Sequence, residues 1–115
     1  IANYTYSKND YLIAKDVGPG NCLMDIYINQ TKKLDYDKDG QLASMGRIDM
    51  SLINNILDQE YYNTLDKHSL DLKDFDVNFV KGLSIEDALA NLNFFTAKVI
   101  SEKINNEIPR CIRIK

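Results

Sequence analysis

Apolar residues recur at three- and four-residue intervals along two long stretches of the chain, and this spacing constrains the fold more than any other feature. Each stretch presents one apolar and one polar face, which is typical of an amphipathic helix packed on a core. The first runs from about 46 to 65 and carries Ile48, Leu52, Ile53, Ile56, Leu57 and Tyr61. The second starts with Ser84 and Asp87, spaced as in a capping box, and ends before Pro109.

A third, shorter helix is predicted from Cys22 to Tyr27, because Asn21 is a good N-cap residue and apolar residues follow it at helical spacing. Three amphipathic helices in 115 residues predict a mainly α protein. The expected architecture is a small single-domain helical bundle over residues 1–115, in which two helices flank an acidic loop at 35–46.

The remaining segments carry weaker patterns. Residues 1–7 show no periodicity and are expected to form a flexible arm. The stretch from Lys8 to Lys15 is expected to form a short helix, which stops at the Gly-Pro-Gly breaker at 18–20. Apolar and polar residues alternate at about 74–80, which favours one short strand.

The charge balance excludes nucleic acid as a partner, and the absence of a long apolar run excludes a membrane. Seventeen acidic residues against fourteen basic ones give a formal net charge of −3, which provides no basic surface for nucleic acid. No apolar run approaches the roughly 20 residues of a membrane-spanning helix. Neither nucleic acid nor a membrane is therefore expected as a partner, and the oligomeric state is not indicated.

The two cysteines, Cys22 and Cys111, lie near opposite ends of the predicted core. An even pair in a small domain favours a disulfide formed in an oxidising compartment. The sequence also begins with Ile rather than Met, as it does after removal of a signal peptide. We therefore expect a secreted or periplasmic protein with a Cys22–Cys111 bridge. The alternative is a pair of reduced, buried thiols.

Residues 35–40 read Asp-Tyr-Asp-Lys-Asp-Gly, and this run resembles the first half of an EF-hand calcium loop. The resemblance implies that Asp35, Asp37 and Asp39 supply carboxylate ligands to a calcium ion. It also implies that Gln41 contributes its backbone carbonyl. The expected cofactor is therefore Ca²⁺.

The second half of the loop departs from the EF-hand pattern. Gly46 stands at the twelfth position, where the family has a bidentate Glu, so the resemblance implies weak binding. Asp49, three residues further, is a further candidate ligand. The predicted calcium ion would then have a structural role and stabilise the packing of the two helices that flank the loop. The alternative is a simple turn in which aspartates cap the backbone.

The run Gly20-Asn21-Cys22-Leu23 resembles the start of the catalytic helix in ovarian-tumour-type and other papain-like cysteine hydrolases. The resemblance implies a Cys22 nucleophile at a helix N-terminus with His68 as its base. It covers only four residues, and Pro19 replaces the preceding Asp of that family. Since a bridged Cys22 cannot attack a substrate, we expect no enzymatic activity.

An exported helical domain without a catalytic site is expected to bind another protein. Its acidic surface fits a basic partner, as in an inhibitor or immunity protein directed against a secreted toxin or hydrolase. The candidate contact residues are Tyr62, Asp66, Asp71, Asp74 and Asp76, because tyrosines beside charges are common at interfaces. The alternative function is an EF-hand-type calcium-binding module, either a buffer or an adhesion domain.

Overall fold

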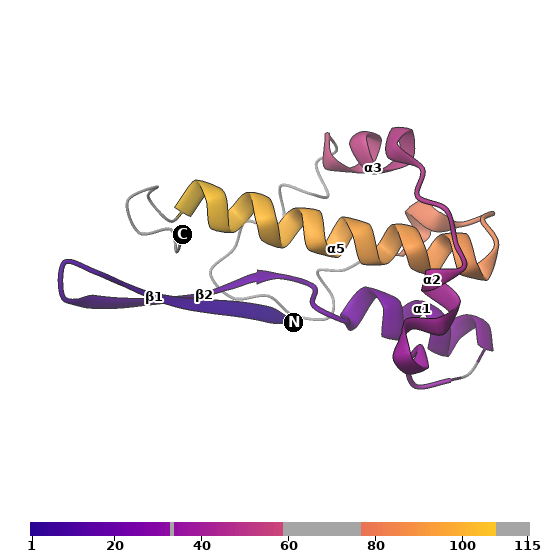
Figure 1. The fold of residues 1–115 in the computed structure, drawn as a ribbon, viewed down its shortest axis with the longest axis horizontal. Coiled ribbons are helices and arrows are strands. Elements are labelled where there is room, and N and C mark those ends of the chain that lie inside the picture. Colours follow the sequence, from indigo (N-terminus) through magenta and orange to yellow (C-terminus); the bar gives the residue numbers. More distant parts are fainter. Residues whose placement is uncertain (33, 59–76, 108–115) are drawn as a thin grey trace.

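A two-stranded sheet at the start of the chain is followed by helices (Figure 1). The computed structural model describes residues 1–32, 34–58 and 77–107. Along the chain the elements are β1 (Ala2–Lys8), β2 (Tyr11–Gly18), α1 (Cys22–Lys32), the 3₁₀ turn η1 (Lys38–Gly40), α2 (Gln41–Ser44), α3 (Met50–Leu57), the 3₁₀ turn η3 (Asn78–Val80) and α5 (Ile85–Glu107).

The longest helix, α5, is the element around which the others pack. The Ser84 hydroxyl oxygen accepts a hydrogen bond from the backbone N–H of Asp87 at 3.1 Å, which confirms the predicted start of this helix. Helices α1 and α2 and strand β2 contact α5. In Figure 1, α3 lies on one side of α5 and α1 and α2 lie on the other. The prediction of a mainly helical protein is confirmed.

The core contains side chains from α1, α3, η3 and α5. Its buried members are Leu23, Tyr27, Ile28, Ile53, Ile56, Val80, Ala88, Leu89, Leu92, Phe95 and Val99. Phe79 is half-buried, and its ring packs against that of Phe95 with 5.3 Å between centroids. Most of these residues belong to the periodic stretches, so the pattern identified the core faces.

The prediction for residues 1–18 is wrong, because these residues form a β-hairpin rather than an arm and a short helix. In β1, Tyr4 and Tyr6 are half-buried while Asn3 and Thr5 are exposed, which is the alternation of a strand. The two tyrosine rings stack at 5.7 Å between centroids. The molecule is therefore a helical assembly with an added hairpin, not a bundle of helices alone.

The turn of the hairpin explains why two strands form here. Asn9 and Asp10 both have positive φ, 52° and 68°. Two such residues in sequence are typical of a type I′ turn, whose twist matches that of antiparallel strands. Lys8 pairs with Tyr11 directly across this turn.

Two further predictions about elements need correction. The second helix is shorter than expected, since α3 begins at Met50 instead of residue 46. The expected strand at about 74–80 is not present where the structure describes it, because residues 78–80 form the 3₁₀ turn η3, and residues 74–76 lie outside the described part. Within the described ranges, no helix is long and apolar enough to cross a membrane.

Candidate functional site

The junction between β2 and α1 is a tight turn packed against α5. A Cβ atom on Gly18 would lie 3.3 Å from two α5 side chains, and Pro19 is fully buried. Gly20 has a φ of +58°, in the left-handed region that favours glycine. The Pro19 carbonyl accepts a hydrogen bond from the backbone N–H of Cys22 at 3.0 Å, so the chain passes directly from this turn into α1.

Asp16 stands near the carboxyl end of β2, two residues before this turn, and pairs with Asn3 of β1. Its side chain is half-buried. A half-buried carboxylate at this place is a candidate for proton transfer. Asp16 is not among the residues predicted from sequence, because residues 8–15 were expected to form a helix and not a strand.

A groove of about 380 Å³ follows one side of α1 away from this junction. It is lined by Cys22, Asp25, Ile26, Asn29, Gln30 and Asp35. Burial raises the pKa of the Asp25 carboxyl, and the positive charge of the amino terminus partly opposes this rise. The groove therefore offers carboxylate and amide groups to a polar ligand.

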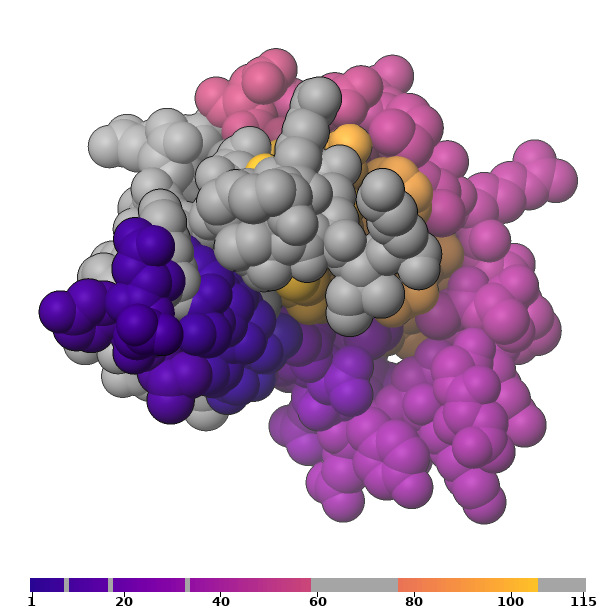
Figure 2. Space-filling view, turned by 60° about the vertical axis from the view of Figure 1, so that its left-hand side comes forward, coloured from indigo at the N-terminus to yellow at the C-terminus, as the bar shows by residue number. Residues whose placement is uncertain are grey.

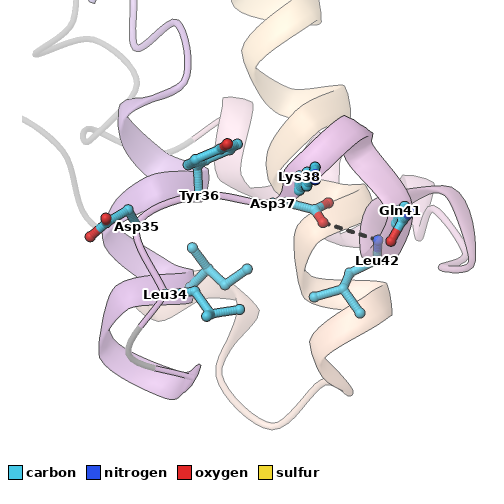
Figure 3. A pocket seen from close by; sticks show the side chains of 8 residues that line it. Leu34, Asp35, Tyr36, Asp37, Lys38, Gln41 and Leu42 are labelled. Atoms are coloured by element: carbon cyan, nitrogen blue, oxygen red, sulfur yellow. Dashed lines mark hydrogen bonds between the residues drawn. The ribbon is translucent and has the colours of Figure 1, made fainter.

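The acidic loop does not direct its carboxylates toward a common centre. Both carboxylate oxygens of Asp37 accept hydrogen bonds from backbone amides of α2, from Leu42 at 3.1 Å and from Ala43 at 3.0 Å. Figure 3 shows Asp37 directed at α2, whereas the Asp35 carboxylate points away from it. Asp39 is exposed and has a φ of 56°. Asp37 is thus a cap for α2.

The other candidate metal ligands have separate positions. Gln41 is exposed at the start of α2. Asp49 is the N-cap of α3, where its carboxylate accepts a hydrogen bond from the Leu52 N–H at 3.2 Å. Among the residues that the structure describes, no three acidic, cysteine or histidine side chains are grouped to hold a metal ion. Calcium binding by Asp35, Asp37, Asp39 and Gln41 stays a prediction.

An open pocket of about 480 Å³ lies between α1, the acidic loop and α2 (Figure 3). Its lining residues are Ile28, Leu34, Asp35, Tyr36, Asp37, Lys38, Gln41 and Leu42. Ile28 belongs to the buried core, while Leu34 and Tyr36 are exposed. The lining of this pocket therefore combines four apolar or aromatic side chains with four polar or charged ones.

The segment from 46 to 49 has no regular secondary structure and is held against the first turns of α5. The Asp87 carboxylate accepts a hydrogen bond from the Arg47 N–H at 2.8 Å. The fully buried Asn91 accepts from the Asp49 N–H at 2.9 Å and donates to the Arg47 carbonyl at 3.0 Å. We call this set of contacts the Asn91 clamp. It occupies the Arg47 carbonyl, which a helix starting at residue 46 would need for its own hydrogen bond to the N–H of residue 51.

Gly46 allows the clamp to form. A Cβ atom there would overlap the backbone carbonyl of Glu86 and would lie 2.8 Å from the Ala90 side chain. Only a residue without a side chain lets the chain approach α5 this closely.

Several predicted site residues lie outside the described residues, so their predictions are not tested. These are the partner-binding residues Tyr62, Asp66, Asp71, Asp74 and Asp76, the base His68 and the second cysteine Cys111. Cys22 is half-buried at the start of α1, and its thiol accepts a hydrogen bond from the amino terminus of Ile1 at 3.1 Å. The Cys22–Cys111 disulfide stays a prediction.

Comparison with known proteins gives a consistent match along the chain. The family model of anhydro-N-acetylmuramic acid kinase matches residues 1–114. An anhydro-N-acetylmuramic acid kinase of Pelagibacter ubique is 38% identical over 112 residues, covering 94% of this chain and 30% of the relative. One of Zymomonas mobilis is 38% identical over 108 residues, covering 91% of this chain and 29% of the relative. The chain therefore spans about three tenths of the length of these curated relatives.

This match overturns the functional predictions from sequence. The likeness to an EF-hand is confined to a few residues, whereas the kinase family matches residues 1–114, so membership of an EF-hand family is wrong. The expected inhibitor or immunity protein, the calcium-binding module and the papain-like hydrolase are likewise wrong, and so is the expectation of no enzyme. The expectation of a secreted or periplasmic protein, drawn from the two cysteines and the absence of an initial Met, is also wrong.

Proposed function

Since the chain belongs to the anhydro-N-acetylmuramic acid kinase family, we propose that residues 1–114 provide one segment of a kinase that phosphorylates anhydro-N-acetylmuramic acid. The observation that carries this proposal is the family match over residues 1–114. A local motif can arise by chance, but an identity of 38% spread over 112 residues reflects a shared fold and shared packing.

The reaction of such a kinase moves a phosphoryl group. A nucleoside triphosphate gives up its terminal phosphoryl group, so the bond between the β- and γ-phosphates breaks and a nucleoside diphosphate leaves. A new P–O bond forms to the acceptor. The protein mainly positions the two substrates and supplies positive charge around the phosphates. It also supplies a carboxylate that accepts the proton of the nucleophile.

Within the segment, Asp16 has the best position for this carboxylate. It is half-buried near the carboxyl end of β2, and the tight turn that follows is fixed by its packing on α5. Asp37, by contrast, holds the amides of α2, and Asp87 belongs to the Asn91 clamp. We assign Asp16 the role of general base, which accepts the proton of the attacking nucleophile as the P–O bond forms.

A chimera tests the proposed function. Residues 1–114 of this chain replace the matched segment of the Pelagibacter ubique relative, and phosphoryl transfer from ATP to anhydro-N-acetylmuramic acid is measured. The control chimera carries the corresponding segment of the Zymomonas mobilis relative, which is equally similar to this chain at 38% identity. We expect both chimeras to phosphorylate the sugar.

The control separates two reasons for failure. If neither chimera is active, the exchange of segments itself is disruptive, and the test is repeated with the Zymomonas mobilis relative as host. If only the chimera with this chain is inactive although it melts cooperatively, the segment does not perform this function, and the proposal is wrong.

A further inference from the structure

We propose that residues 34–50 form a docking surface for the part of an anhydro-N-acetylmuramic acid kinase that lies outside the matched segment. This inference rests on the proposed function. The match covers 30% of the Pelagibacter ubique relative, so most of that protein lies outside the matched segment and is available to pack against it. We call residues 34–50 the docking segment.

Exposed apolar side chains concentrate in the docking segment. The described part of the chain has eight large exposed hydrophobic residues, and five of them fall here: Leu34, Tyr36, Met45, Ile48 and Met50. Figure 2 shows the chain from the acidic loop to α3 forming one flank of the molecule. Exposed apolar residues gathered on one surface mark an interaction site, and Met, Tyr and Arg are enriched at such sites. Met45 is the most exposed of the five at 64%.

The backbone of the docking segment is already fixed in the shape that it would present. The Asn91 clamp holds Arg47 and Asp49 on α5, and Gly46 packs closely against the same helix. Both oxygens of Asp37 hold the first turn of α2. A surface ordered before binding loses less conformational entropy when a partner covers it. These polar contacts therefore favour an interface.

The segment also contains a receiving pocket. The pocket of about 480 Å³ beside the acidic loop has core residue Ile28 in its lining and the exposed Leu34 and Tyr36 at its rim (Figure 3). Binding energy at protein interfaces concentrates where anchoring side chains enter such pockets. The occupant that fits is an apolar side chain from the remaining part of the kinase.

Thiol labelling of the chimera measures whether the docking segment is covered. The native cysteines of the chimera are replaced by alanine, and Met45→Cys and Ile48→Cys are introduced one at a time. Asn54→Cys is the matched control, because Asn54 is exposed on the neighbouring helix α3 and has a polar side chain. Each variant is reacted with a small thiol reagent in the folded state and in urea.

We expect positions 45 and 48 to react at least about tenfold more slowly than position 54 in the folded chimera, and all three to react equally in urea. Equal rates in the folded chimera would overturn the docking surface. The labelling rates do not depend on enzymatic turnover. A chimera that is inactive but protected at positions 45 and 48 would therefore contradict the proposed function and support the docking surface. A chimera that is active but labels rapidly at both positions would support the proposed function and contradict the docking surface.

Discussion

The buried amide of Asn91 is the single side chain on which the path of the chain between α2 and α3 depends most. It is fully buried and makes hydrogen bonds to the Asp49 N–H, the Arg47 carbonyl and the Asp87 carbonyl. When a buried polar group loses its hydrogen-bond partner, the free-energy cost of its desolvation is no longer offset, and the folded state is destabilised. We expect Asn91→Ala to lower the free energy of unfolding in urea by about 2–3 kcal/mol.

Asn93 provides the control for this prediction, since it lies on the same helix but is exposed. Replacing an exposed helical Asn with Ala removes no buried contact and slightly favours the helix. Equal effects of Asn91→Ala and Asn93→Ala on urea unfolding would show that the Asn91 clamp does not stabilise the fold.

Asp37 has a role that the sequence suggested only as the alternative to metal binding. Its two carboxylate oxygens accept from the amides of Leu42 and Ala43, as a helix cap does. We expect Asp37→Ala to lower the unfolding free energy by about 1 kcal/mol in the presence of a calcium chelator. Asp35→Ala, a change at an exposed residue, should have almost no effect under the same conditions. The capping role is rejected if both variants unfold at the same urea concentration as the parent chain.

At the scale of elements, the hairpin turn offers the clearest test of the corrected fold. Type I′ turns prefer Asn followed by Gly, and here Asp10 has a φ of 68° in the second position. Residues with a side chain adopt a positive φ at a steric cost, and replacing Asp10 with glycine removes this cost. We expect Asp10→Gly to raise the unfolding free energy by about 0.5–1 kcal/mol, because glycine adopts a positive φ without a steric cost.

The matched change is Ser7→Gly, at an exposed position inside β1. Glycine weakens a regular strand, so this variant should be less stable than the parent chain. If both glycine variants are destabilised to the same extent, residues 9 and 10 do not form the turn seen in the structure.

The elements that could be predicted from sequence are those with local signals. The start of α5 follows from Ser84 and Asp87, and its core face follows from apolar residues at helical spacing. The late start of α3 could not be predicted, because Asn91 and Asp49 are 42 positions apart in the chain. The hairpin was missed because the breaker at 18–20 was taken as the end of a helix, and because Asn9-Asp10 lacks the glycine that usually marks a two-residue turn between strands.

At the scale of the whole molecule, the candidate site could not be predicted from its motifs. The acidic loop has the spacing of a calcium loop, but Asp37 caps α2 and Asp35 points away from it. Asp16 is part of neither resemblance considered from sequence, and its position becomes informative when β2 and the turn into α1 are known. The family relation is found by a match over residues 1–114, and not by the short motifs that were considered from sequence.

The central claim is that this segment takes part in phosphoryl transfer. The most direct test is to measure the turnover number of the chimera with and without the Asp16 carboxylate. Asp16→Asn keeps the size of the side chain but removes the base. The control is Asp10→Asn at the exposed tip of the hairpin. We predict that Asp16→Asn lowers kcat by about 10²-fold or more while the chimera still melts cooperatively, and that Asp10→Asn leaves kcat unchanged. A chimera whose kcat is the same in both variants would contradict the account.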